Sequence, residues 1–277
     1  MPADTPRLSA TDDGLAAAVE GNLHALFRYF AAVLPGAELV EGSHFNHHHA
    51  SPTNPMFKGV WSTRLPPEAA DAAIDEMVAW YRARQAPFMF WWHTNRTQPA
   101  DLGARLEAHG FQQFSLADPG MAVDLGDLPP LPATPPGFSI VRAVDQRTLE
   151  DWRDAFLFAF ELAHVPMAGQ AWVDATLAAG PDGASWQLYL GYLDGQPVAT
   201  NMLVLGDGVA GLYAVGTVPA ARRKGIGAAI TLQPLLDARA QGYRYGVLFA
   251  TEMGLPMYKR LGYREVDSRI GRHLLFL

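Results

Sequence analysis

Residues 213–230 read YAVGTVPAARRKGIGAAI, the most specific stretch of the sequence. An apolar run leads into a proline and three basic residues, after which Gly225 and Gly227 open a second apolar run. The pattern predicts a strand that turns into a helix, and the first backbone N–H groups of such a helix are free to bind an anion. Because glycine has no side chain, the main chain can approach a diphosphate closely. We interpret the stretch as a diphosphate-binding loop.

Other interpretations of the loop fit less well. In an ordinary strand-to-helix turn, basic side chains at the helix N-terminus would oppose the helix dipole. A dinucleotide fingerprint requires a third glycine or alanine where Ile230 stands. A nucleoside-triphosphate loop would end in Gly-Lys followed by Ser or Thr, which is missing here.

The loop resembles that of the GNAT superfamily of N-acetyltransferases, which reads Arg/Gln-x-x-Gly-x-Gly/Ala. The resemblance implies acetyl-CoA as cosubstrate, with the diphosphate held by backbone N–H groups and the pantetheine arm paired to the preceding strand. The cofactor-binding residues that it implies are Val215, Gly216, Thr217, Arg222, Arg223, Lys224, Gly225, Ile226, Gly227 and Ala228.

A second match to the family lies in ATEMGLPMYKRLGYREV, residues 250–266. Tyr258 occupies the position of the family's usual general acid, which protonates the departing thiolate. Taken alone, a tyrosine on a short helix is more often a core residue. Two departures from the family pattern are Thr251, where asparagine is common, and Pro234, which interrupts the helix after the loop and should kink it unless a neighbour compensates.

The chain divides at GDLPPLPATPPG, residues 126–137, where five prolines prevent a helix or central strand from continuing. We expect residues 1–125 to form a degenerate GNAT-like domain and residues 138–277 the catalytic domain. The first half has no Arg-x-x-Gly-x-Gly, and aligning its Gly110 with Gly262 puts Leu106 where Tyr258 stands. The predicted fold is α+β, with two tandem GNAT-like domains, each a mostly antiparallel twisted sheet flanked by helices.

The apolar periodicity predicts individual elements. Helices are expected at 14–34, 67–85, 100–110, 149–163, 169–180, 221–240 and 255–261. Strands are expected at 57–65, 87–94, 111–118, 121–125, 138–144 and 245–251, as three strands within 185–218 joined by Asp-Gly turns, and as a closing pair after residue 263. The histidine-rich segment before residue 57 is expected to be a polar loop.

Acceptor selection is assigned to the first helix pair of the second half and its surroundings. The candidates are Phe156, Phe160, His164, Trp172 and Glu252. For the two phenylalanines ordinary core packing is an open alternative, for His164 a surface position, and for Glu252 a solvated carboxylate or a residue that orders a water.

Composition narrows the chemistry. Without cysteine there is no acyl-cysteine intermediate and no thiolate metal site, and a net charge of −7 disfavours nucleic acid as a partner. His44, His47, His48 and His49 lack the spacing of a metal site, so we expect no metal. No apolar run reaches the length of a membrane span, and we expect a soluble cytoplasmic protein without a membrane partner.

These observations predict an acetyl-CoA-dependent N-acetyltransferase in which a primary amine of a small molecule or protein attacks directly in a ternary complex. Polyamines, amino acids, aminoglycoside-like antibiotics and protein N-termini all remain possible acceptors. The alternatives are a non-catalytic acyl-CoA sensor and a transferase that uses a different acyl donor.

Overall fold

Eleven strands of the described chain join in one sheet, in the order β1-β2-β3-β4-β11-β5-β10-β9-β8-β7-β6. The computed structural model describes residues 11–50, 57–165, 167–180 and 185–277. The strands are β1 (Glu38–Glu41), β2 (Asn46–His49), β3 (Lys58–Trp61), β4 (Phe88–Thr94), β5 (Gln112–Asp124), β6 (Phe138–Arg142), β7 (Trp186–Leu193), β8 (Gln196–Gly206), β9 (Val209–Thr217), β10 (Tyr245–Phe249) and β11 (Arg264–Phe276). The helices are α1 (Asp12–Val33), α2 (Ala70–Ala83), α3 (Leu102–Ala108), α4 (Gln146–Ala159), α5 (Met167–Ala179), α6 (Ile226–Ala240) and α7 (Leu255–Arg260).

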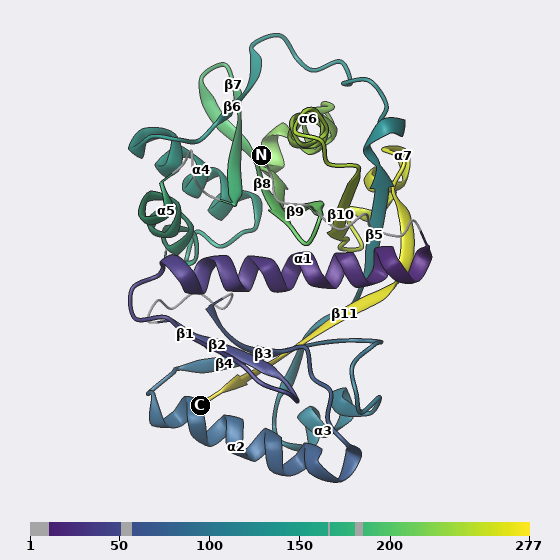
Figure 1. Ribbon diagram of the computed structural model, residues 1–277. Helices are drawn as coiled ribbons and strands as arrows, with labels where there is room; N and C mark the ends of the chain where they lie inside the picture. The colour runs from purple at the N-terminus through teal and green to yellow at the C-terminus, as the bar shows by residue number, and fades with distance from the viewer. Residues whose placement is uncertain (1–10, 51–56, 166, 181–184) are drawn as a thin grey trace.

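The two halves of the chain exchange their last strands. β5 leaves the first half and pairs with β10 of the second, while β11 leaves the second half and pairs with β4 of the first. The two exchanged strands also pair with each other, antiparallel. Figure 1 shows β11 descending from the upper half of the molecule into the lower half. The division at residues 126–137 into independently folding domains stays a prediction.

Helix α1 lies between the two halves (Figure 1). Its buried side chain Asn22 donates hydrogen bonds to the carbonyl oxygens of Val204, at 3.1 Å, and Gly206, at 2.9 Å. The Asn22 carbonyl oxygen accepts from the Tyr213 hydroxyl at 2.9 Å. A Cβ at Gly211 would lie 1.8 Å from that oxygen, so only glycine fits there. A polar side chain thus docks a helix of the first half onto the β8–β9 hairpin of the second.

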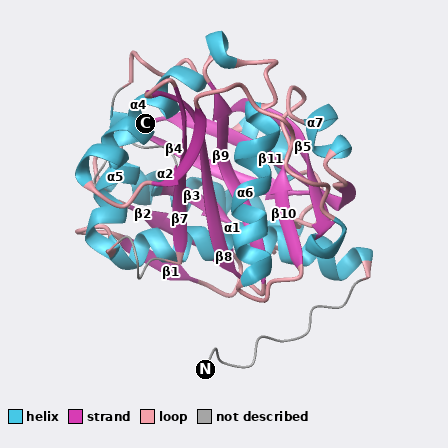
Figure 2. Cartoon of the chain, turned by 90° about the horizontal axis from the view of Figure 1, so that it is seen from above, coloured by secondary structure: helices cyan, strands magenta, loops and turns pink. Residues whose placement is uncertain are grey.

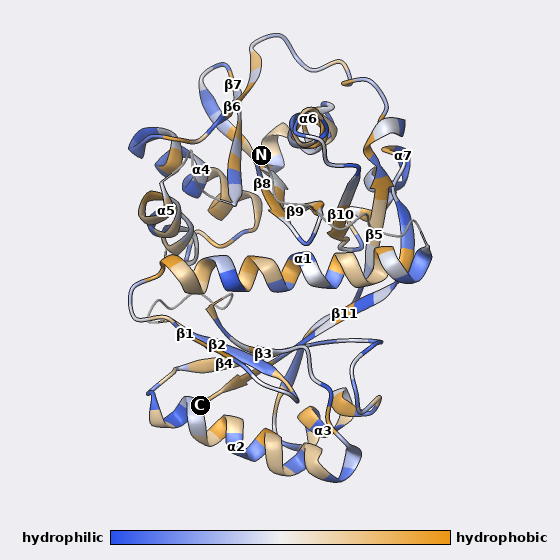
Figure 3. Cartoon of the chain, viewed as in Figure 1, coloured by the Kyte–Doolittle hydropathy of each residue, from blue (hydrophilic) through white to orange (hydrophobic). Residues whose placement is uncertain are grey.

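The helices cover both faces of the sheet, as the view from above shows (Figure 2). In the second half, α4, α5 and α1 bury one face, and α6 buries the other with α7 beside it. In the first half, α1 again covers one face, while α2 and α3 cover the other. Hydrophobic segments recur along α1 in Figure 3, as expected for a helix that contacts both halves.

The predicted fold class is confirmed: mostly antiparallel sheet in both halves, flanked by helices. Both Asp-Gly turns have positive φ at their two central residues, 50° and 78° at Asp194 and Gly195, and 53° and 74° at Asp207 and Gly208. This is the turn geometry that joins twisted hairpin strands.

Two of the predicted strand pairs are single long strands. Residues 111–118 and 121–125 merge into β5, where Pro119 lies at irregular pairing with β11 and the missing N–H is tolerated. The expected closing pair is the one strand β11. Gly271 does not mark a turn there, since a Cβ at this position would lie 2.6 Å from the His93 ring.

The histidine-rich segment is not a polar loop. His47, His48 and His49 lie on β2, and the first two are buried. The His48 ring stacks on Phe27 at 4.8 Å between ring centroids and accepts a hydrogen bond from the Trp61 indole at 3.0 Å. These imidazoles pack as aromatic core residues, which a hydropathy pattern does not indicate. His44 remains exposed. SPTNP, next to this segment, lies in residues 51–56, outside the described residues.

Pro234 lies inside α6 without ending the helix. A residue other than proline at 234 would donate its N–H to the carbonyl oxygen of Ile230. The buried Asn201 side chain on β8 donates to that oxygen instead, at 2.8 Å. The side-chain amide of Asn201 therefore compensates for the N–H that Pro234 lacks.

A double-mutant cycle tests whether the Asn201 amide replaces the N–H that is missing at Pro234. Asn201→Ala should lower the free energy of unfolding by about 1–3 kcal/mol, because it leaves a buried carbonyl unpaired. In a Pro234→Ala background the helix N–H can take that carbonyl, and the same mutation should cost less. Urea denaturation of the four proteins measures the coupling, and strictly additive effects would contradict it.

Candidate functional site

The loop between β9 and α6 presents a run of free backbone donors. Within the described chain, none of the backbone N–H groups of residues 223–228 donates a hydrogen bond, and α6 has no side-chain cap. Arg223 and Gly225 have positive φ, 66° and 79°, with Lys224 between them. When positive and negative φ values alternate along the backbone, successive N–H groups turn toward one side and form a concave anion site. The helix dipole of α6 adds positive potential at the same place.

Arg222 holds the loop in position. Its Nε donates to the carbonyl oxygen of Thr217 at 2.9 Å, and its Nη2 to that of Ala159 at 3.2 Å. The guanidinium therefore ties the loop to the ends of β9 and α4. The side chains of Arg223 and Lys224 are exposed beside it and add positive charge.

β9 and β10 are parallel strands that diverge after two paired positions. They pair only at Ala210 with Gly246 and Gly211 with Val247, so the edge of β9 from residue 212 to 217 has no strand on that side. An extra residue in β9 opposite β8 forms a bulge, where Ala214 has a φ of 50°. Val215, Gly216 and Thr217 lie just past the bulge and lead into the loop.

The bulge is held by a residue that the sequence patterns did not single out. Thr200 on β8 donates its hydroxyl to the Ala214 carbonyl oxygen at 2.8 Å. No local signal marks either residue, because the contact joins positions 14 apart across a hairpin.

Tyr258 lies on α7, next to the first turn of α6. A Cβ at Gly227 would lie 3.3 Å from Met257 Sδ and 3.6 Å from Thr217 Oγ1, so α6, α7 and the end of β9 meet here. The Tyr258 ring is 7% exposed, and burial raises the pKa of its phenol well above the usual range. No described residue hydrogen-bonds to its hydroxyl, which is therefore a neutral donor at physiological pH.

Of the acceptor-side candidates, the structure brings two to the bulged strand. The Phe156 and Phe160 rings lie 4.8 Å apart, and Phe156 also stacks on Trp152. A Cβ at Gly216 would lie 2.9 Å from the Phe160 ring, which is 42% exposed. Phe160 thus borders the predicted pantetheine strand, with Phe156 buried behind it.

The other candidates lie elsewhere. Trp172 is 4% exposed and contacts the Phe30 and Phe57 rings in the core between the halves, so it is a buried core residue. His164 is exposed in the segment before α5, and Glu252 is exposed before α7. Thr251 accepts a hydrogen bond from the Gly254 N–H at 3.3 Å and so closes the local turn.

Residues 139–260 match the model of the acetyltransferase (GNAT) domain. The second half of the chain belongs to the GNAT superfamily. A GNAT domain is an acyltransferase module that generally uses acetyl-CoA. A search of curated proteins gives no match.

The whole chain has the fold of tandem GNAT proteins. A GCN5-related N-acetyltransferase from Kribbella flavida superposes with a TM-score of 0.70 at 21% identity, over 92% of this chain and 94% of that one. One from Sphaerobacter thermophilus gives 0.61 at 18%, over 96% and 94%. A tandem GNAT protein from the clavulanic acid biosynthesis pathway gives 0.59 at 15%, over 97% and 96%. At these identities the likeness establishes the fold.

No helix of the described residues is both long and apolar enough to cross a membrane. The same residues contain no group of three or more His, Asp or Glu side chains arranged to hold a metal ion.

Gly225 and Gly227 should respond differently to alanine. At Gly225 the positive φ is unfavourable for a side chain, and a Cβ would lie 2.6 Å from the Ala133 carbonyl oxygen of the linker. Gly225→Ala should therefore cost at least about 1–2 kcal/mol of unfolding free energy. Gly227→Ala meets only the flexible end of Met257 and should be neutral or slightly stabilising. Denaturant unfolding measures both, and equal effects would contradict this assignment.

Proposed function

We propose that this protein transfers the acetyl group of acetyl-CoA to a primary amine of a small molecule or a protein, by direct attack in a ternary complex. One observation carries the proposal. The run of free N–H groups at residues 223–228 lies at the end of a strand whose edge is open to a partner. A diphosphate attached to an extended amide chain is the ligand that matches both features.

The residues fit that ligand without rearranging any recorded contact of the loop. Backbone N–H groups of residues 223–228 would hold the diphosphate, with Arg223 and Lys224 adding charge. The pantetheine amides would pair with the edge at Val215, Gly216 and Thr217. Ile226 is buried and anchors the first turn of α6.

Bound acetyl-CoA supplies an activated thioester carbonyl. To the segment 215–217 we assign the backbone N–H that polarises this carbonyl. To Tyr258 we assign the proton that reaches the leaving sulfur. Its buried phenol stays protonated at neutral pH because desolvation disfavours the phenolate, so the proton is available when a thiolate departs.

The acceptor amine attacks as the free base. Glu252 and His164 are both exposed, and neither has a described partner that would tune it as a general base. We assign to Glu252 at most the ordering of a water near the amine. Phe160, beside Gly216, is the side chain best placed to contact the acceptor.

Tyr258→Phe should lower kcat by roughly 10²–10⁴-fold while leaving acetyl-CoA affinity unchanged, because only a proton donor is lost. Tyr263→Phe is the matched control: that ring is also buried, its centroid lies 5.7 Å from that of the Tyr258 ring, and no described residue hydrogen-bonds to its hydroxyl. Steady-state kinetics with thiol detection and calorimetry with acetyl-CoA measure both variants. A wild-type kcat in Tyr258→Phe removes Tyr258 from the mechanism.

Gly227→Leu should weaken acetyl-CoA binding by at least about tenfold, because the side chain would fill the space between Thr217 and Met257. Gly227→Ala, which adds one methyl group, is the graded control and should bind within a few-fold of the natural protein. Calorimetry gives both constants, and denaturant unfolding shows that the fold is kept. Equal affinity of the two variants would contradict the placement of the cofactor.

A panel of acyl-CoAs and amines separates the alternatives. Thiol release that depends on both acetyl-CoA and an amine supports the proposal. Release with a longer acyl donor alone would favour a different acyltransferase. Binding without release for every amine would favour a sensor. The absence of cysteine keeps the thiol signal free of protein background.

A further inference from the structure

The bulge of β9 puts an alanine in a conformation that alanine rarely adopts. The pairing of β8 with β9 shifts by one residue between Thr200 and Met202. Two residues of β9, Ala214 and Val215, therefore lie opposite the single residue Asn201. The φ of Ala214 is 50°, which is uncommon for residues other than glycine. Such a conformation persists only where the surrounding structure holds it.

Two buried side chains hold the backbone at the bulge. The Thr200 hydroxyl donates to the Ala214 carbonyl oxygen at 2.8 Å, and the Trp152 indole of α4 donates to the Asn201 carbonyl oxygen at 3.3 Å. Both donors are 0% exposed. A Cβ at Gly216 would lie 3.4 Å from Thr200 Oγ1 and 2.8 Å from a side chain of α4, so the hydroxyl lies beneath that helix. Solvent therefore does not compete for the Thr200 hydrogen bond.

The Thr200 contact also sets the direction of a backbone N–H. A peptide group is planar and trans, so the carbonyl oxygen of one residue and the N–H of the next point in opposite directions. The Ala214 carbonyl points to Thr200 on β8. The Val215 N–H therefore points away from β8, toward the edge of β9 that has no strand beside it.

The described part of the first half has a matching pair of parallel strands, β3 and β4, without a bulge beside them. β2 pairs with β3 in one continuous register. Beyond β3, the Leu65 N–H donates to the Gln98 carbonyl oxygen at 3.0 Å, and the Gln98 N–H donates to that of Thr63 at 3.2 Å. These bonds close the edge. The bulge and its buried hydroxyl thus occur in the half whose parallel strands stay open.

We propose that Thr200 is a positioning residue for acetyl transfer, which aims the Val215 N–H at the thioester carbonyl oxygen of acetyl-CoA. This assignment rests on the proposed function, in which an N–H of the segment 215–217 polarises that carbonyl, and it names the N–H and the side chain that directs it. A donor that is fixed in advance stabilises the charge that develops on the oxygen without reorganising. Thr200 is fully buried and acts only through the Ala214–Val215 peptide group.

Thr200→Val tests the proposal, because it removes the hydroxyl and keeps the size of the side chain. Infrared difference spectroscopy with acetyl-CoA labelled at the acetyl carbonyl measures the polarisation directly and needs no acceptor. We expect binding to the natural protein to lower the carbonyl stretching frequency, and Thr200→Val to lose most of that shift. Thr200→Ala, which is too short to crowd the Ala214 oxygen, should lose it as well, whereas Thr200→Ser keeps the hydroxyl and should retain it.

The kinetic constants should separate in the same variants. Without the hydroxyl, kcat should fall roughly 10–100-fold, because a small misplacement of a polarising donor is costly. Calorimetry should show acetyl-CoA affinity within a few-fold of that of the natural protein, because the loop at 223–228 is unchanged. In Thr200→Ser, kcat should stay within a few-fold of the natural value.

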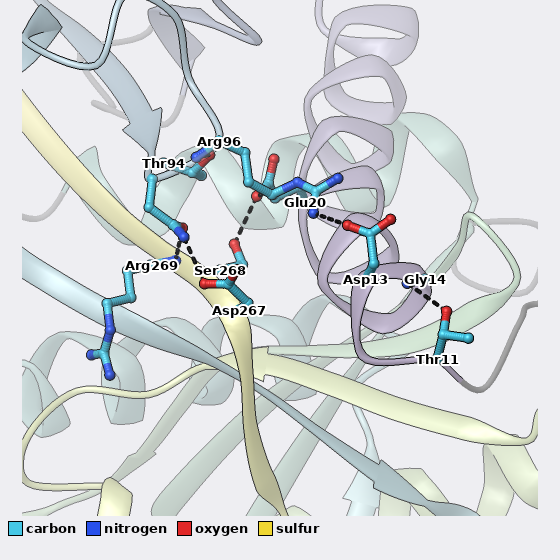
Figure 4. Close-up of polar contacts among 10 residues, drawn as sticks. Thr11, Asp13, Gly14, Glu20, Thr94, Arg96, Asp267, Ser268 and Arg269 are labelled. Carbon is cyan, nitrogen blue, oxygen red and sulfur yellow. Dashed lines mark hydrogen bonds and ion pairs between the residues drawn. The ribbon is translucent and has the colours of Figure 1, made fainter.

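Ser268→Ala is the matched control. Ser268 is also 0% exposed, and its hydroxyl donates to the Glu20 carboxylate of α1 at 2.8 Å, the same length as the Thr200 bond (Figure 4). The variant removes a buried hydroxyl that joins α1 to β11. It should lower the free energy of unfolding and leave the carbonyl frequency and kcat unchanged.

The possible failures can be told apart. If the natural protein does not bind acetyl-CoA, the proposed function is wrong, and the role of Thr200 with it. If acetyl-CoA binds and Thr200→Val and Thr200→Ala keep the natural carbonyl frequency and kcat, only the role of Thr200 is wrong. The same conclusion follows if the natural protein does not shift the frequency, or if Thr200→Ser or Ser268→Ala loses the shift to the same extent.

Discussion

The antiparallel pairing of β5 with β11 joins the two halves of the molecule. Each of these strands also completes the other half's sheet, through β10 on one side and β4 on the other. The two halves therefore share one hydrogen-bonded framework. α1, fixed by Asn22 to the β8–β9 hairpin, then has a sheet on both of its sides, and the candidate site of the second half lies on strands that this framework holds in register.

The two halves differ in how a parallel strand pair ends. Beside β9 a bulge at Ala214, held by Thr200, leaves an unpaired edge that leads to free N–H groups. Beside β3 the chain makes two backbone hydrogen bonds with Gln98. Pro66 and Pro67 then stand where free backbone N–H groups would be needed to bind an anion. The same architecture thus leaves an open strand edge in one half and closes the corresponding edge in the other. The degenerate character of the first half has this physical basis.

The loop at 222–228 could be predicted from the sequence because its features are local: two glycines, basic residues and a helix start lie within a few positions. Tyr258 was singled out by its spacing to Gly262 and stays a prediction, whereas the turn glycines were predicted from their dipeptides and are confirmed. The strand exchange, the Asn201 amide that replaces the Pro234 donor, and the packing of His48 against Phe27 depend on contacts between distant positions. No window of one sequence contains them, so β2 was expected to be a loop and β11 a pair.

The position of β4 has a consequence during synthesis. Its core residues, from Met89 to Trp92, are apolar, and its edge opposite β3 is covered only by β11, which comes from residues 264–276. A nascent chain therefore carries an aromatic strand with an open edge until residues 264–276 have been synthesised. Open apolar edges template aggregation. The sheet of the first half is complete only when β11 is present, so a fragment that contains the first half alone should aggregate.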